Sequence, residues 1–129
     1  MHVTDLVAAI PYARFLGVRV ERTPAGLLCV LPFRRELVGN PNLPALHGGV
    51  LGAFLELTAI LQLIEAEESA RVARPINFGI DYLRTARPRE TRARAEIVKL
   101  GRRVANVRAV AWQDDPDRPV AAGNGKFLL

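Results

Sequence analysis

The sequence predicts an α+β domain in which an antiparallel sheet surrounds one long central helix. Two observations predict it. Residues 48–64 contain a single charge, Glu56, and have the length and apolar composition of a buried helix. Segments of strand composition precede this stretch and follow it, separated by turn residues. The 129 residues are expected to form a single domain, 1–129, since this length supports one hydrophobic core.

Before the central helix the sequence predicts one short helix and a β-hairpin. Thr4 is a candidate N-cap, and Pro11 is expected to stop the short helix. The turn signal Thr-Pro-Ala-Gly at residues 23–26 separates two strands. The predicted ranges are a helix over residues 5–10 and strands over residues 15–21 and 27–33.

The central helix is predicted over residues 47–68 and is apolar on nearly every side, so it should be buried all round. Residues 34–46 before it are irregular, because Gly39, Pro41 and Pro44 forbid a continuous element. After Pro75 the hydrophobic period changes to that of strands. Four strands in meander order are predicted over residues 76–86, 92–100, 104–113 and 120–128.

Composition excludes several classes of function. Cys29 is the only cysteine, and His2 and His47 are the only histidines, so neither a disulfide nor a zinc site is expected. Residues 1–10 lack the pattern of a signal peptide, and no membrane segment is expected, which predicts a cytoplasmic protein. The net charge of +5 comes almost entirely from arginine and suits an anionic ligand. Nucleic acid is not favoured, because the arginines are scattered and only 6% of residues are aromatic.

The start of the central helix is a candidate catalytic element. The first backbone N–H groups of a helix have no intrahelical partner, and the helix dipole adds positive potential there. Gly48 and Gly49 carry no side chain that would block access to these amides. They could therefore stabilise an oxygen with developing negative charge. His47, just before them, could orient a substrate or serve only as scaffold.

Glu56 is the candidate acid or base. Placing a lone carboxylate among apolar residues costs free energy, and a catalytic role would explain why it is present. It lies nine residues beyond His47, roughly 13 Å along the helix, so one carbonyl group cannot contact both. If both act on one substrate, they come from two copies of the chain packed about a two-fold axis, which predicts a homodimer. In the alternative reading, Glu56 is structural and pairs with an arginine.

Residues 40–50, with Glu56 at this spacing, resemble the hotdog-fold acyl-CoA thioesterases of the PaaI-like and 4-hydroxybenzoyl-CoA thioesterase group. Residues 81–86, 101–103 and 121–125 look like the sheet of the same family. The resemblance implies a hotdog fold and hydrolysis of an acyl-CoA thioester at a dimer interface, with CoA as part of the substrate and no separate cofactor. It implies that Glu56 attacks the thioester or activates water, and that the Gly49 amide, helped by Gly48, polarises the carbonyl.

Two parts of the family site are less well defined in this chain. Related enzymes often carry Asn six positions before the histidine, where this chain has Pro41, so Asn42, Thr58 or Asn77 is a candidate for positioning water. The CoA phosphates need cationic partners. The candidates, at strand ends, turns and the loop after the helix, are Arg84, Arg102, Arg103, Arg74 and Arg71.

The main alternative function is a non-catalytic acyl-CoA binder or sensor on the same fold, with Glu56 structural. A hotdog hydratase is disfavoured, because no second histidine suits that chemistry. The sequence leaves the acyl group open, as well as the choice between a dimer and a dimer of dimers.

Overall fold

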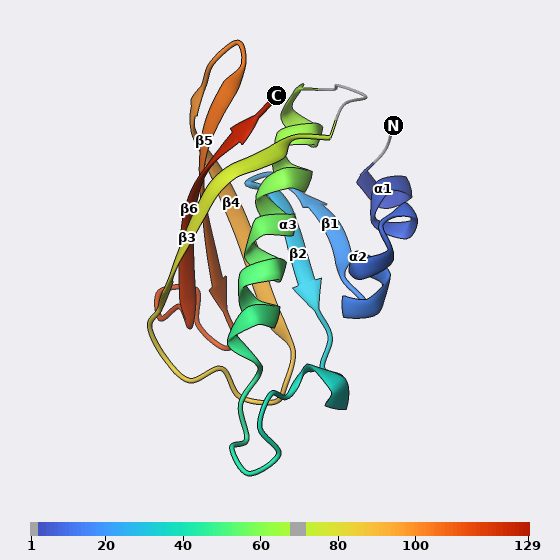
Figure 1. Ribbon diagram of the computed structural model, residues 1–129, viewed down its shortest axis with the longest axis vertical. Helices are drawn as coiled ribbons and strands as arrows, with labels where there is room; N and C mark the ends of the chain where they lie inside the picture. Colours follow the sequence, from blue (N-terminus) through green and yellow to red (C-terminus); the bar gives the residue numbers. More distant parts are fainter. Residues whose placement is uncertain (1–2, 68–71) are drawn as a thin grey trace.

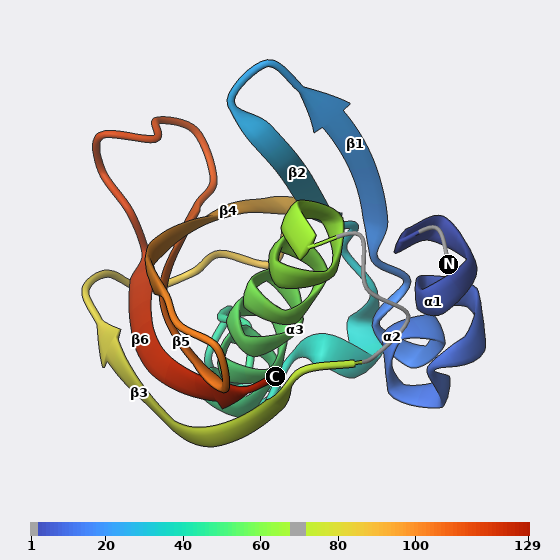
Figure 2. The same ribbon diagram turned by 90° about the horizontal axis from the view of Figure 1, so that it is seen from above.

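The computed structural model describes residues 3–67 and 72–129 and has one antiparallel sheet curled around a long helix (Figures 1 and 2). The strand order is β1-β2-β4-β5-β6-β3, which places β1 and β3 at the two edges. This is the predicted architecture. The elements in chain order are α1 (Val3–Ala9), α2 (Pro11–Leu16), β1 (Arg19–Thr23), β2 (Gly26–Leu31), a 3-10 turn (Arg35–Leu37), α3 (Gly48–Glu67), β3 (Arg74–Tyr82), β4 (Thr91–Leu100), β5 (Val104–Trp112) and β6 (Ala121–Leu128).

The N-terminal segment differs from the prediction, because Pro11 begins a second helix. Proline is favoured in the first helical turn, where its missing N–H has no intrahelical acceptor. Phe15, predicted to start a strand, therefore lies in α2. Gly17 ends that helix with φ 74°, a left-handed conformation that glycine adopts without strain. The first strand begins only at Arg19.

The predicted β1–β2 hairpin is confirmed and is tied to the central helix. The Thr23 hydroxyl donates to the carbonyl oxygen of Gly26 across the turn, at 2.7 Å. The first backbone N–H beyond the turn, on Leu27, donates to Oε1 of Gln62 on α3, at 2.9 Å. This bond fixes the hairpin against the C-terminal half of the helix.

The central helix α3 packs on β2, β3, β4, β5 and β6 and forms the core. Between Gly49 and Ile60 every residue is buried except Gly49, Ala53, Glu56 and Ile60. The spacing of these four places them on one side of the helix. The prediction that α3 is buried all round is therefore wrong along this stripe, because the sheet ends at β3 and leaves one side of the helix uncovered (Figure 2).

The length and mean hydropathy of α3, 1.6, would allow it to cross a membrane. However, 56% of this stretch is buried inside the protein, as is typical of a core helix. Residue 68, the predicted end of the helix, lies outside the described residues.

The last four strands do not form a simple meander. β4, β5 and β6 pair in chain order, but β3 pairs with β6 rather than with β4. Both sides of β4 are taken, by β2 and β5, so β3 cannot pair with it and lies instead on the free side of β6. The prediction of a four-strand meander is therefore wrong for β3.

A phenylalanine holds the edge strand β3 against the sheet. Phe78 of β3 lies opposite Gly125 of β6, with Gly123 two positions along the same strand. A Cβ atom added at Gly123 or Gly125 would lie 2.5 Å or 2.4 Å from a Phe78 ring atom. The ring therefore occupies a slot that exists only because both residues lack side chains. We call this feature the Phe78 slot.

Candidate active site

The loop before α3 is held by backbone hydrogen bonds that fix the start of the helix. The His47 N–H donates to the Leu37 carbonyl oxygen at 2.8 Å. The Leu46 N–H donates to the carbonyl oxygen of Ala86, in the segment after β3, at 2.9 Å. The helix start is thus anchored on both sides, by the chain that precedes it and by the end of the β3 region.

His47 acts as the N-cap of α3. Its Nδ1 atom accepts a hydrogen bond from the Gly49 N–H at 2.9 Å, and its carbonyl oxygen accepts from Val50 and Leu51 at 3.0 and 3.2 Å. The Gly48 N–H has no hydrogen-bond partner among the residues that the structure describes. In this arrangement Gly48 offers the free amide, whereas the Gly49 amide is engaged by the imidazole.

Tyr82 links the end of β3 to the helix start. Its hydroxyl donates to the carbonyl oxygen of Gly48 at 2.7 Å. One turn further along α3, Gly52 allows β3 to come close, since a Cβ there would lie 2.5 Å from Cδ1 of Ile80. The edge strand and the helix start are therefore held as one unit.

Glu56 lies on the same side of α3 as Gly49, seven residues and about 10 Å further along the axis. Its carboxylate makes no hydrogen bond or ion pair with any residue in the described ranges 3–67 and 72–129. Partial burial raises its pKa above the usual carboxyl value, because desolvation disfavours the charged form. Within these ranges, the alternative in which Glu56 pairs with an arginine of its own chain is therefore not found.

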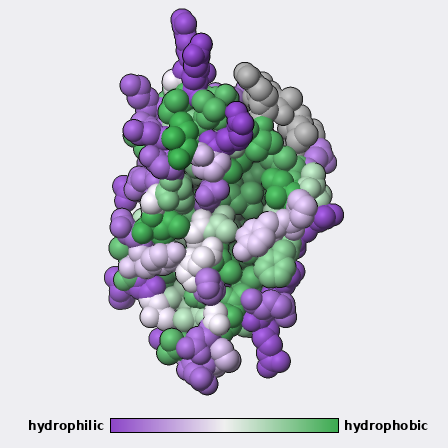
Figure 3. Space-filling view, in the orientation of Figure 1, coloured by the Kyte–Doolittle hydropathy of each residue, from purple (hydrophilic) through white to green (hydrophobic). Residues whose placement is uncertain are grey.

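The neighbours of Glu56 on the stripe are apolar. Ala53 and Ile60 flank it on the stripe and are only partly buried. Apolar residues run through the middle of the face on which α3 lies, and hydrophilic residues gather towards the two ends (Figure 3). A carboxylate in such surroundings suits proton transfer or attack on a carbonyl carbon.

The three candidates for positioning water lie in different surroundings. Thr58 is buried and donates to the Phe54 carbonyl oxygen at 2.8 Å, so its hydroxyl is directed into the helix. Asn77 lies on β3, where its side-chain oxygen accepts from the Lys126 N–H at 3.2 Å. Asn42 is exposed in the loop before α3, and its backbone N–H donates to Oδ1 of Asn40 at 2.9 Å. Asn42 alone among them is in the loop that leads to the helix start.

The predicted phosphate-binding arginines are divided between the two ends of the molecule. Arg84 follows β3 at the end where α3 begins, whereas Arg74 at the start of β3 and the β4–β5 turn with Arg102 and Arg103 lie at the other end (Figure 1). Arg71 lies outside the described residues. Of the predicted arginines in the described part of the chain, only Arg84 therefore lies on the side of the helix start.

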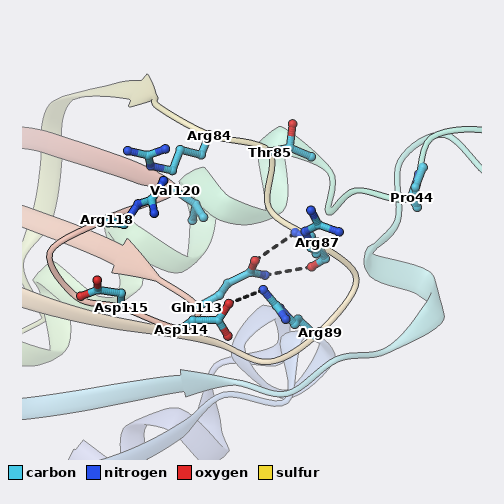
Figure 4. Close-up of a pocket in the computed structure, with 10 residues that line it drawn as sticks. All are labelled: Pro44, Arg84, Thr85, Arg87, Arg89, Gln113, Asp114, Asp115, Arg118 and Val120. Carbon is cyan, nitrogen blue, oxygen red and sulfur yellow. Dashed lines mark hydrogen bonds and ion pairs between the residues drawn. The ribbon is translucent and has the colours of Figure 1, made fainter.

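Three arginines near Arg84 were not predicted as site residues. Arg87, Arg89 and Arg118 line a pocket together with it (Figure 4). The density of arginine in residues 84–89 was the available signal, but the contribution of Arg118 depends on the sheet order. No group of three or more His, Cys, Asp or Glu side chains suited to a metal ion occurs in the described part of the chain.

The family is identified by comparison with known proteins. Residues 43–120 match the model of the thioesterase superfamily. The medium/long-chain acyl-CoA thioesterase YigI of Escherichia coli is 30% identical over 93% of this chain and 86% of its own length.

Solved structures agree with this match. A Chromobacterium violaceum protein is 39% identical, with a TM-score of 0.79 over 98% of this chain and 88% of its own. A Pseudomonas aeruginosa protein is 26% identical, with a TM-score of 0.86 over 98% and 96% of the two chains. The predicted hotdog fold is confirmed, and this chain belongs to the thioesterase superfamily as a thioester hydrolase.

Proposed function

We propose that this protein hydrolyses an acyl-CoA thioester to a carboxylic acid and free CoA, with Glu56 as nucleophile or general base. The observation that carries the proposal is the position of Glu56, partly desolvated, without a charged partner among the described residues, and on the same helix face as Gly49. The name of the Escherichia coli relative supports acyl-CoA as substrate and favours medium or long acyl chains. The cytoplasmic location predicted from the sequence is part of the proposal.

The active site is proposed to lie between two subunits. Gly49 and Glu56 are about 10 Å apart along one helix, too far to act on one carbonyl group. Two helices packed antiparallel about a two-fold axis would bring Gly49 of one subunit to Glu56 of the other. The edge strand β3 supports this arrangement, because its outer side has unpaired backbone groups and its residues Ile76 and Tyr82 are 55% and 56% exposed.

Both chemical roles of Glu56 end in the same products. As a base it takes a proton from water, whose oxygen attacks the carbonyl carbon. The C–S bond then breaks, and the departing thiolate receives the proton. As a nucleophile it forms a mixed anhydride as the C–S bond breaks, and water then hydrolyses the anhydride. In both cases negative charge develops on the carbonyl oxygen, where the helix-start amides stabilise it.

The Gly49 amide can polarise the carbonyl only if the bond to His47 is released or shared. In the proposed order of events, the substrate carbonyl oxygen first accepts a hydrogen bond from the free Gly48 N–H. The His47 ring then releases the Gly49 N–H, which donates to the same oxygen. This gives His47 a positioning role. Asn42 remains the candidate for holding the water molecule, on the ground of its place in the loop before α3.

The first experiment measures hydrolysis of a panel of short, medium, long and aromatic acyl-CoA esters by wild type and E56Q. We expect kcat to fall by about 100-fold or more in E56Q. E67Q, at the end of the same helix, is the matched control and should retain full activity. Full turnover by E56Q would exclude Glu56 from the mechanism. No hydrolysis by wild type, together with thermal stabilisation by acyl-CoA, would favour the non-catalytic binder.

A second experiment tests the shared site. G49P removes the Gly49 N–H at a helix position where proline is tolerated. Refolding an equal mixture of inactive G49P and E56Q should restore about one quarter of wild-type activity, since half the dimers are mixed and each has one intact site. No restoration, with both variants folded and dimeric, would mean that each site lies within one chain.

A further inference from the structure

Tyr82, the last residue of β3, is bonded to the peptide group that joins Gly48 to Gly49. Its hydroxyl donates to the Gly48 carbonyl oxygen at 2.7 Å. That carbonyl and the Gly49 N–H belong to one planar peptide unit, in which the C=O and N–H groups share delocalised electrons and point in opposite directions. The hydroxyl therefore acts on the Gly49 amide from the far side of the same peptide.

The Tyr82 ring lies against the helix start in space that two glycines leave free. A Cβ atom added at Gly48 would lie 3.4 Å from Cε1, Cζ and Oη of Tyr82. A Cβ atom added at Gly52, one turn along α3, would lie 3.7 Å from the same Oη atom. The ring thus packs on the first turn of the helix, and this packing keeps the hydroxyl at the Gly48 carbonyl.

The backbone that carries the Tyr82 ring is fixed. Tyr82 pairs with Ala121 in the ladder between β3 and β6. The next two backbone N–H groups, those of Leu83 and Arg84, both donate to the carbonyl oxygen of Val120, at 2.9 and 3.1 Å. The end of β3 therefore holds the ring at a defined place beside the helix, as a side chain that orients another group requires.

Only one of the two candidate amides belongs to the peptide that Tyr82 contacts. The Gly48 N–H is part of the preceding peptide, whose carbonyl is that of His47. The Gly49 N–H is part of the contacted peptide and donates to Nδ1 of His47 at 2.9 Å. The hydroxyl, the peptide and the imidazole thus form a chain of hydrogen bonds. Bonds in such a chain polarise one another and are each strengthened by about 10–30%.

We propose that Tyr82 is a positioning residue for thioester hydrolysis, which orients and strengthens the Gly49 N–H as a donor through the Gly48 carbonyl. This rests on the proposed function, because it requires the Gly49 amide to stabilise the carbonyl oxygen during the reaction. That oxygen gains negative charge only as the transition state forms. A stronger Gly49 donor therefore raises kcat and leaves KM nearly the same.

The kinetic test uses Y82F, which removes the hydroxyl and keeps the ring. Complete loss of an oxyanion donor lowers kcat by about 100- to 1,000-fold, whereas Y82F weakens the donor without removing it. We expect kcat to fall about tenfold in Y82F, with KM nearly unchanged. The matched control is Y12F, because Tyr12 on α2 is the only other tyrosine and is 49% exposed. Y12F should keep the wild-type kcat.

A second control separates positioning from loosening of the strand. Ile80, two residues before Tyr82, also lies against the first turns of α3, since its Cδ1 would be 2.5 Å from a Cβ at Gly52. I80V removes this carbon and leaves the Tyr82 hydroxyl in place. It should keep kcat near the wild-type value even if it lowers the melting temperature as much as Y82F does. An equal fall of kcat in I80V and Y82F would overturn the positioning role.

The state of the peptide can be measured without catalysis. Residues 48 and 49 are the only adjacent glycines in the sequence. With glycine alone labelled by ¹³C at the carbonyl and by ¹⁵N, an NMR spectrum that correlates each amide with the preceding carbonyl contains one signal, from the Gly48 carbon and the Gly49 N–H. A hydrogen bond to a carbonyl oxygen moves its carbon signal downfield. The Gly48 carbon should therefore move upfield in Y82F and stay in place in Y12F and I80V.

Two further results would overturn the proposal. An unchanged Gly48 carbon signal in Y82F would mean that the hydroxyl does not polarise this peptide. A shifted signal with an unchanged kcat, or with a change in KM alone, would mean that the polarised peptide does not act in the transition state. Failure of the proposed function is recognised separately: wild type would hydrolyse no thioester, while the Gly48 signal would still differ between wild type and Y82F.

Discussion

The contact between α3 and β3 can be tested by filling the space at Gly52. In G52A the added Cβ would lie 2.5 Å from Cδ1 of Ile80, whereas carbon atoms in contact are about 3.5–4.0 Å apart. Ile80 must therefore shift by roughly 1 Å or more. Such overpacking costs about 1–3 kcal/mol, while alanine in place of glycine gains about 1 kcal/mol in helix propensity. We expect G52A to lower the free energy of unfolding by about 0–2 kcal/mol.

The matched background is I80V, which removes Cδ1. The nearest contact of a Cβ at Gly52 is then the Tyr82 hydroxyl at 3.7 Å, an ordinary distance. In this background G52A should raise the free energy of unfolding by up to about 1 kcal/mol, so that the two substitutions couple by about 1–3 kcal/mol.

Urea unfolding at one fixed protein concentration measures all four proteins of this cycle. Trp112 is the only tryptophan and is 8% exposed, so its fluorescence reports the transition. Equal destabilisation by G52A in both backgrounds would refute the contact between Gly52 and Ile80. The same outcome would weaken the argument that β3 and the helix start move as one unit.

Two further predictions concern titratable groups. Because burial raises the pKa of Glu56, the native state holds its proton more tightly than the unfolded state, and stability falls as pH rises from the ordinary carboxyl pKa to the raised native pKa. E56Q should therefore have a higher melting temperature than wild type at pH 7. This difference in melting temperature should vanish at pH values below that window. A lower melting temperature for E56Q at pH 7 would contradict the prediction. Burial raises the pKa of the Cys29 thiol to about 11, so Ellman's reagent at pH 8 should label it only after unfolding, and rapid labelling of the native protein would show that the thiol is accessible.

The sequence predicted the elements whose pattern is local. The single charge in residues 48–64 identified the core helix, and turn residues separated the strands correctly to within a few residues. Pro11 ends the first helix as predicted, but it also begins a second one, and the strand expected from Phe15 therefore starts only at Arg19. The pairing of β3 with β6 was not predicted either, since it depends on which sides of the other strands are already paired.

The relative placement of the candidate site residues could be predicted in part for the same reason. Gly48, Gly49 and Glu56 lie on one helix, so the regular geometry of the helix converts their spacing directly into a distance and a face. The bond between His47 and the Gly49 amide depends on a side-chain conformation, which spacing does not determine. The pocket in Figure 4 joins residues 84–89 to Arg118, and only the sheet order brings these two segments together.

The Phe78 slot constrains how this protein can diverge. Any residue larger than glycine at position 123 or 125 would displace the Phe78 ring, and β3 would then lose its packing contact with β6. Substitutions that adapt the enzyme to new acyl groups must therefore arise elsewhere, on the open flank of the helix or in the connecting loops. Descendants of this chain should inherit both glycines even where their substrates have changed.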